Sequence, residues 1–120
     1  MIYRDHLIPV HTSVRSALEK LDVLSSNAVV FLVDENDQLQ GALTDGDIRR
    51  GLIKGLDMQS PLMDFANPNP KRIEKQRYDI HQIIAYREKR FDILPVVDAE
   101  MRGINVVNLR EQRSYLPGDA

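Results

Sequence analysis

The sequence predicts an α+β fold in which two tandem halves of mixed helix and strand pack with pseudo-twofold symmetry. Two observations carry this prediction. An apolar, β-branched run that ends in Val-Asp occurs twice, at Val29–Val33 before Asp34 and within Asp92–Asp98. The two Val-Asp pairs stand 64 positions apart, and each follows an amphipathic helical pattern and precedes a turn and a second strand. A repeat of this length indicates two copies of one structural unit.

Composition limits the classes of function. A chain of 120 residues fits one compact domain or two small halves that share a core. The net charge of −2 argues against a nucleic-acid partner, and the absence of cysteine excludes disulfides, thiolate metal sites and a cysteine nucleophile. The sequence shows neither the apolar core of a signal peptide nor a window long enough for a membrane span. We therefore expect a cytoplasmic protein with no membrane partner.

The first half begins with a short strand and a helix. The apolar piece within Tyr3–His11 is interrupted by Pro9, which restricts it to a short or edge strand. Thr12 or Ser13 is expected to cap the helix that follows. The apolar residues of that helix fall at i, i+3, i+4 and i+7, and they are Val14, Ala17, Leu18 and Leu21.

The stretch Val29–Lys54 predicts a hairpin followed by a second helix. The polar residues Glu35–Asp37 form the turn and Leu39–Leu43 the second strand. Thr44–Asp47 breaks the strand and opens a helix that Gly55 ends. The apolar residues expected on this helix are Ile48, Leu52 and Ile53.

The second half repeats the order after a loop-rich connector, Leu56–Pro70. A short strand is expected around Ile73, and an amphipathic helix then runs to about Arg90. Its apolar stripe consists of Ile80, Ile83 and Ile84. The run Asp92–Asp98 and a strand at Ile104–Val107 follow. Leu62, Met63 and Phe65 could pack as a short element within the connector. The expected divisions are residues 1–57, 58–112 and a linker-like tail at 113–120.

The junction Thr44–Asp47 concentrates the candidate chemistry. A helix N-terminus exposes unpaired N–H groups and suits a phosphate, and Gly46 lets a ligand approach the backbone. The Thr44 hydroxyl can bond phosphate, while the two oxygens of Asp47 suit a pair of ribose hydroxyls. Arg49 and Arg50 add positive charge one turn later. These residues predict a nucleotide site.

Alternatives remain open at this junction and elsewhere. Asp45 could simply cap the helix, or Asp45 and Asp47 could share a Mg²⁺ ion brought in by a nucleotide. The three histidines are far apart in sequence, so structural roles are favoured over a metal site. They are His6, His11 and His81. The serines lack the Gly-x-Ser-x-Gly pattern of a hydrolase. We predict no catalytic residue and no metal site.

The strand ending in Val33-Asp34, followed by Gly41-Ala42-Leu43-Thr44 and then Asp47, resembles the motif of the cystathionine-β-synthase-type (CBS) domain. The run Phe91–Asp98 resembles the same family's Leu-Pro-Val-Val-Asp strand. The resemblance therefore covers two motifs in tandem, a Bateman module, whose members commonly dimerise through their helices. It implies that Thr44 contacts phosphate and Asp47 contacts ribose of AMP, ADP or ATP. His11 stands where the family often lines its ligand pocket.

The second copy departs from this motif when the two are aligned on Gly41 and Gly103. Val106 then takes the place of Thr44, and Leu109 takes the place of Asp47. This alignment predicts one competent nucleotide site and one degenerate site. The basic residues Arg87, Lys89 and Arg90 precede the strand within Asp92–Asp98. They either form a solvated helix end or contact phosphate. The second role is included because family members often place basic residues just before this strand.

The resemblance implies a regulatory module, acting as a homodimer, that binds an adenosine nucleotide and controls an attached or partner enzyme. The tail Leu116–Ala120 resembles the lead-in to a sugar-nucleotidyltransferase domain, which would lie C-terminal to this chain. The junction Thr44–Arg50 is also similar to those of CBS pairs on sugar-phosphate enzymes. The alternative is a structural dimerisation module that binds no ligand.

Overall fold

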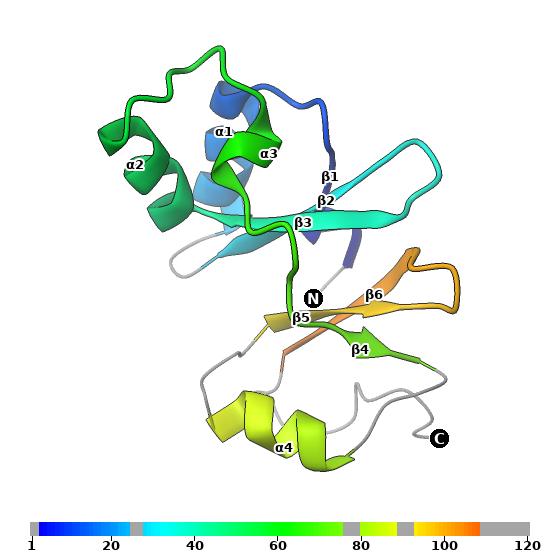
Figure 1. Cartoon of the computed structure of the whole chain (residues 1–120). Helices are drawn as coiled ribbons and strands as arrows, with labels where there is room; N and C mark the ends of the chain where they lie inside the picture. The colour runs from blue at the N-terminus through cyan, green and yellow to red at the C-terminus, as the bar shows by residue number, and fades with distance from the viewer. Residues whose placement is uncertain (1–2, 25–27, 76–79, 89–92, 109–120) are drawn as a thin grey trace.

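The computed structural model describes residues 3–24, 28–75, 80–88 and 93–108, and it confirms the α+β class. Helices α1, α2 and α3 cover the outer face of one sheet, and α4 covers the outer face of a second sheet (Figure 1). The elements are η1 (Tyr3–His6), β1 (Leu7–Pro9), α1 (Val14–Leu24), β2 (Val29–Val33), β3 (Leu39–Thr44), α2 (Asp45–Ile53), α3 (Leu62–Phe65), β4 (Ile73–Glu74), α4 (Ile80–Glu88), β5 (Ile93–Val97) and β6 (Gly103–Asn108).

Each half contains a three-stranded sheet of the same topology. In the first sheet β2 is central, with β1 parallel and β3 antiparallel to it. In the second sheet β5 is central, with β4 parallel and β6 antiparallel. The predicted internal repeat is thus confirmed over the described strands. The helix expected after β6 falls in residues 109–120, outside the described residues.

Apolar side chains build a core in each half and a third layer between the sheets. The predicted stripe of α1 packs against β2, with Val14, Ala17 and Leu21 fully buried. In the second half Ile73, Ile83 and Leu94 belong to one smaller cluster. The layer that joins the two sheets contains Phe31, Leu39, Val97 and Val106. The halves therefore pack through their sheets.

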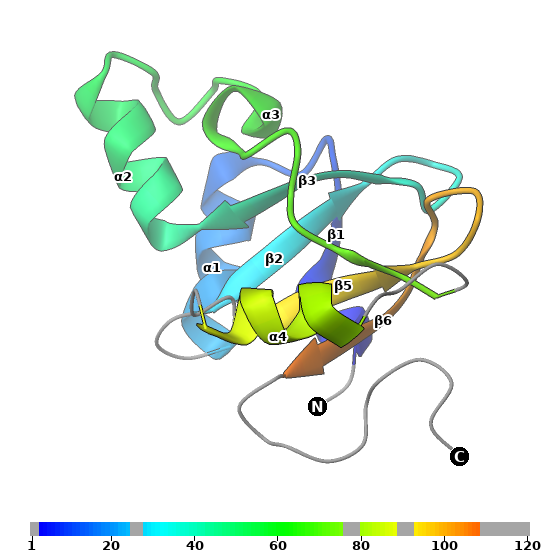
Figure 2. The same cartoon turned by 60° about the horizontal axis from the view of Figure 1, so that its bottom comes forward.

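The two hairpin turns also bond to each other, at the same end of the molecule (Figure 2). The Leu39 N–H donates to the Met101 carbonyl at 2.8 Å, and the Gly103 N–H donates to the Asp37 carbonyl at 2.9 Å. The Gln38 amide adds a bond to the Glu100 carbonyl at 2.9 Å. These bonds fix the halves relative to each other at the hairpin tips.

The register shows that the two turns have equal length, which corrects the alignment on glycine. Val33 pairs with Leu39, and its equivalent Val97 pairs with Gly103. Gly103 is therefore the counterpart of Leu39 rather than of Gly41. The reason is that every residue pair of the first hairpin has its counterpart 64 residues later in the second hairpin.

The corrected register changes the comparison of the two junctions. Val29 pairs with Thr44 and Ile93 pairs with Asn108, so Asn108, and not Val106, is the counterpart of Thr44. Along the sequence the same offset aligns Glu111 with Asp47. Both Leu109 and Glu111 lie outside the described residues. The alignment that supported a degenerate second site was wrong, and the degeneracy itself stays an untested prediction.

Helix α2 buries a different face from the one expected. Ile48 is buried, but Leu52 and Ile53 are 40% and 77% exposed. Gly51 takes the inward position, because a Cβ there would lie 2.2 Å from Cδ1 of Phe65. The Phe65 ring from α3 fills the space that a larger residue would need, and the apolar side chains that follow Gly51 turn outward.

Helix α4 also differs from its predicted stripe. Ile83 is buried at 5% exposure, whereas Ile80 and Ile84 are about half exposed. Helix ends agree better with expectation. Gly55, at φ +112°, ends α2, where the Leu56 N–H donates to the Gly51 carbonyl at 3.0 Å. Ser13 caps α1 by accepting the Ser16 N–H at 3.1 Å.

Candidate functional site

Thr44 and Asp47 close the first turn of α2 as a reciprocal cap. The Thr44 hydroxyl accepts the Asp47 N–H at 3.2 Å, and the Asp47 carboxylate accepts the Thr44 N–H at 3.0 Å. Thr44 has the extended backbone that a cap residue requires because it is the last residue of β3. The expectation that Asp45 caps the helix is wrong, since Asp45 is its exposed first residue.

The carboxylate of Asp47 has a second partner in Arg50. Oδ2 accepts the Thr44 N–H, while Oδ1 pairs with Nη2 of Arg50 at 2.8 Å. The Asp47 side chain is only 23% exposed, and that of Arg50 is 60% exposed. An ionised carboxylate offers about four acceptor positions, so each oxygen retains capacity for one further hydrogen bond.

Gly46 faces the guanidinium of Arg50 rather than open space. A Cβ at Gly46 would lie 3.0 Å from Nη1 and 3.3 Å from Nη2 of Arg50. The close approach predicted for a ligand at this glycine is thus made by an arginine of the same helix. Arg49 is exposed and forms no salt bridge with any described residue.

His6 lies at the same end of the first sheet as this junction, but on the far side of β2 from β3. It is 5% exposed, and its Nδ1 lies 2.9 Å from the carbonyl oxygen of Val29, the residue that pairs with Thr44. Twenty-three positions separate His6 from Val29. Only the parallel pairing of β1 with β2 brings them together, and no local pattern reports that pairing.

His11 does not join the junction. Val10, which precedes it, donates its N–H to the carbonyl of Val33 at 2.8 Å, at one end of β2. Thr44 pairs with Val29 at the other end. Four residue steps along a strand span about 13 Å. The structure therefore places His11 at the opposite end of the sheet from Thr44 and Asp47.

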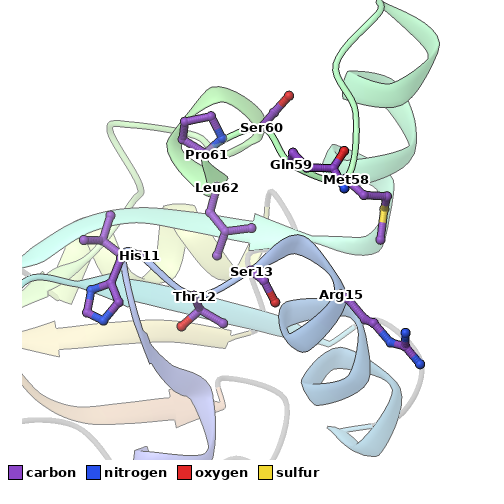
Figure 3. Close-up of a pocket in the computed structure, with 10 residues that line it drawn as sticks. His11, Thr12, Ser13, Arg15, Met58, Gln59, Ser60, Pro61 and Leu62 are labelled. Carbon is purple, nitrogen blue, oxygen red and sulfur yellow. The ribbon is translucent and has the colours of Figure 1, made fainter.

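His11 instead lines a hollow of about 740 Å³ between the start of α1 and the segment before α3. In Figure 3 the side chains of His11 and Arg15 extend to opposite sides, and the Ser60 hydroxyl points outward. Ligand sites combine an apolar lining with polar groups that converge on one place. The hollow has a suitable size but lacks that convergence.

Arg90 lies outside the described residues, so its predicted phosphate contact is untested. Within residues 3–24, 28–75, 80–88 and 93–108, no group of three or more histidines and acidic residues is arranged to hold a metal ion. None of the helices in those ranges combines the length and the apolar character that a membrane crossing requires.

Comparison with known proteins gives several curated relatives and a set of structural neighbours, whereas no family model matches the sequence. The chain is 26% identical over 113 residues to the arabinose 5-phosphate isomerase GutQ of Escherichia coli K12. That match covers 92% of this chain but 35% of GutQ. The chain thus spans about a third of the length of the curated relatives that it matches.

Two solved structures illustrate the structural similarity. CBSX2 in complex with AMP superposes with a TM-score of 0.70 at 26% identity, covering 92% of this chain and 87% of CBSX2. The CBS domain pair of protein MJ0100, in complex with 5′-methylthioadenosine and S-adenosyl-L-methionine, gives 0.67 at 19% identity and covers 92% and 95%. Together with the repeated sheets and the paired turns, these similarities establish that the chain has the fold of a CBS-domain pair.

Proposed function

We propose that this chain is a regulatory module that binds an adenosine nucleotide and controls the activity of an enzyme. The observation that carries the proposal is the junction between β3 and α2. There a half-buried carboxylate, a helix N-terminus and two arginines meet within seven residues of a CBS-pair fold. The complex of CBSX2 with AMP supports an adenosine ligand. AMP, ADP and ATP are the candidates.

Each group of the junction has a role in this proposal. The carboxylate of Asp47 accepts the ribose hydroxyls, and its cap to Thr44 keeps the carboxylate oriented. The start of α2, with the positive charge of Arg49 and Arg50, favours the phosphate. Asp45, the first residue of the helix, and Gly46 border the same place. Arg90 stays a candidate phosphate contact by resemblance alone.

The controlled enzyme is proposed to act on a sugar phosphate. GutQ, an arabinose 5-phosphate isomerase, supports this class, since this chain matches about a third of it. A sugar-nucleotidyltransferase, predicted from Leu116–Ala120, is a second candidate that rests on that resemblance alone. Ligand binding can shift the equilibrium between two conformations of the enzyme only by as much as the ligand's affinities for those conformations differ.

Calorimetric titration of the purified chain with AMP, ADP, ATP, GTP and S-adenosylmethionine tests the proposal. A ligand at 100 times its Kd is expected to raise the free energy of unfolding by about 2.7 kcal/mol, which thermal denaturation detects. Asp47→Asn is the informative variant, because the amide oxygen can still cap α2 while the negative charge is lost. We expect it to weaken nucleotide binding by about 10-fold or more.

Asp64→Asn is the matched control, because it removes one exposed carboxylate from α3, away from the junction. Equal effects of Asp47→Asn and Asp64→Asn would contradict a specific role for Asp47. Failure of every adenosine compound to bind would remove the sensor function.

A structural dimerisation module is the second candidate, and one observation favours it. Large apolar side chains remain exposed on three helices, with Val23 at 80%, Ile53 at 77% and Ile80 at 48% exposure. Most isolated surface apolar residues need no explanation, but exposed apolar side chains on the outer helices of both halves suggest surfaces that a second copy covers. The capping box also accounts for Thr44 and Asp47 without any ligand.

Analytical ultracentrifugation of the wild-type chain and of Ile53→Lys tests this candidate. A stable homodimer that Ile53→Lys dissociates, in a chain that binds none of the nucleotides, would establish the structural module. A homodimer that also binds nucleotide fits the regulatory proposal. A monomer at micromolar concentration would exclude the dimerisation role.

A further inference from the structure

Arg50 occupies the carboxylate that the proposed ligand needs. Its guanidinium pairs with Oδ1 of Asp47 at 2.8 Å and lies against Gly46 at the start of α2. A ribose that bonds to Asp47 must therefore share or displace this partner. Arg49, one position earlier on the same helix, is exposed and has no such pair with a described residue.

We propose that Arg50 makes the site discriminate between a nucleotide and a nucleoside. In the empty site the guanidinium neutralises Asp47. When a nucleotide binds, Arg50 exchanges the carboxylate for the phosphate of the ligand, and Asp47 becomes available to the ribose. This inference rests on the proposed function, and it adds a specificity role that neither the fold nor the motif assigns to this residue.

The geometry permits the exchange with little movement. The guanidinium already lies against Gly46, in the first turn of α2, and the start of a helix favours a phosphate. Arginine carries five N–H donors in a planar fork, and a phosphate oxygen pair matches that fork. The Arg50 side chain is 60% exposed, so neighbouring side chains do not enclose it in its present position.

The absence of a side chain at position 46 is part of the same arrangement. A Cβ there would lie 3.0 Å from Nη1 of Arg50, closer than most Cβ contacts in proteins. Because Gly46 lacks that atom, the guanidinium can lie flat against the first turn. There it reaches Oδ1 of Asp47.

The exchange predicts opposite effects on two related ligands. Adenosine has the ribose but no phosphate, so its binding disrupts the Asp47–Arg50 pair and gives Arg50 nothing in return. AMP supplies the phosphate that replaces Asp47 as the partner of Arg50. Removal of the guanidinium should therefore strengthen adenosine binding and weaken AMP binding.

Calorimetric titration of the full chain and of Arg50→Ala with adenosine and with AMP tests this inference. We expect Arg50→Ala to bind adenosine about 2- to 5-fold more tightly, the range expected for loss of an exposed ion pair. We expect it to bind AMP about 10-fold more weakly, because a charge-assisted hydrogen bond is lost. The ratio of the two affinities is the decisive quantity.

Arg49→Ala is the charge-matched comparison, because it removes the same positive charge from the same helix without breaking a pair with Asp47. We expect it to weaken AMP to a lesser degree and not to strengthen adenosine. Arg50→Lys keeps the charge without the planar fork and should fall between wild type and Arg50→Ala. Circular dichroism checks that helix content is retained, since the Arg50 side chain makes none of the hydrogen bonds that cap α2.

The outcomes separate this inference from the proposed function. A ratio of AMP to adenosine affinity that changes equally in Arg50→Ala and Arg49→Ala would overturn the role of Arg50 and leave the nucleotide site intact. Tighter binding of both ligands by Arg50→Ala would show that Arg50 only competes with the ligand for Asp47 and never contacts phosphate. That result would also overturn the proposed role of Arg50. Absence of binding by the wild type and by every variant would overturn both proposals together.

Discussion

The turns 34–38 and 98–102 have the same pattern of backbone hydrogen bonds, but their aspartates, Asp34 and Asp98, have different side-chain partners. In each turn the aspartate N–H donates to the carbonyl four residues later at 3.1 Å, and Oδ1 accepts two backbone N–H groups at 2.8 to 3.0 Å. The fourth residue of each turn has a positive φ, 62° at Asp37 and 65° at Met101. Aspartate tolerates this conformation better than methionine does.

The difference lies in the remaining carboxylate oxygen. Oδ2 of Asp34 accepts a neutral amide, Nε2 of Gln40, at 3.1 Å, whereas Oδ2 of Asp98 accepts Nε of Arg102 at 2.7 Å. Hydrogen bonds from the Arg102 backbone and side chain hold the pKa of Asp98 below its ordinary value of 3.8. The repeat thus preserves the shape of the backbone, while charge is distributed differently in its two copies.

The prediction with the largest expected effect compares the cores of the two halves. Leu43 and Val107 are counterparts in β3 and β6 and are 0% and 1% exposed. Leu43→Ala should lower the free energy of unfolding by about 2–5 kcal/mol. Val107→Ala removes two carbons instead of three, so its transfer term is about 1.6 rather than about 2.4 kcal/mol and its loss should be smaller. Urea denaturation measures both, and a larger loss for Val107→Ala would show that the second core contributes more.

An intermediate effect sharpens the comparison of the two helix junctions. Thr44→Ala removes the cap of α2 and should cost about 1 kcal/mol of unfolding free energy. Asn108 is its counterpart by register, and asparagine is an equally good cap residue. If the chain after β6 begins a helix as it does after β3, Asn108→Ala should cost a similar amount in thermal denaturation. A loss near zero for Asn108→Ala would contradict the equivalence of the two junctions.

The smallest effect separates the two turns by their dependence on pH. Because the folded state lowers the pKa of Asp98, its ionised form contributes stability at any pH well above 3.8. That contribution is lost as the pH falls below 3.8 through the pKa of the folded state. Asp98→Asn should make the unfolding free energy less sensitive to acid in this range, as followed by urea denaturation at pH 2 to 6. An unchanged acid response would show that the Arg102 pair does not distinguish the turns.

Most of the fold could be predicted from the sequence because apolar residues recur with clear periods in its helices and strands. The strand positions, the α1 stripe and the repeat all follow from local patterns. The register of the second hairpin could not be predicted from the sequence. Gly41 and Gly103 look equivalent in the sequence, but their surroundings in the fold differ. A Cβ at Gly41 would lie 2.9 Å from the Asn67 carbonyl oxygen, whereas at Gly103 the nearest atom would be a Leu7 side-chain carbon at 3.5 Å.

The candidate site was only partly readable for the same reason. The grouping of Thr44, Gly46 and Asp47 follows from their spacing at a helix start, and the structure shows them in one turn. The pairing of Asp47 with Arg50 was not predicted, although their i,i+3 spacing on a helix favours it over a pair with Arg49 at i+2. The separation of His11 from the junction depends on strand pairing across the sheet, which the sequence does not display.

The bonded contact between the two turns affects how the protein can be engineered. Exposed hairpin turns are usually the places where extra residues or whole domains are inserted without harm. Here Leu39 and Gly103 each donate a backbone hydrogen bond to the opposite turn, so the length of one turn is fixed by the other. A reporter domain inserted within 34–38 or 98–102 would separate the two halves at the hairpin tips. These turns are surface positions that behave as an interface.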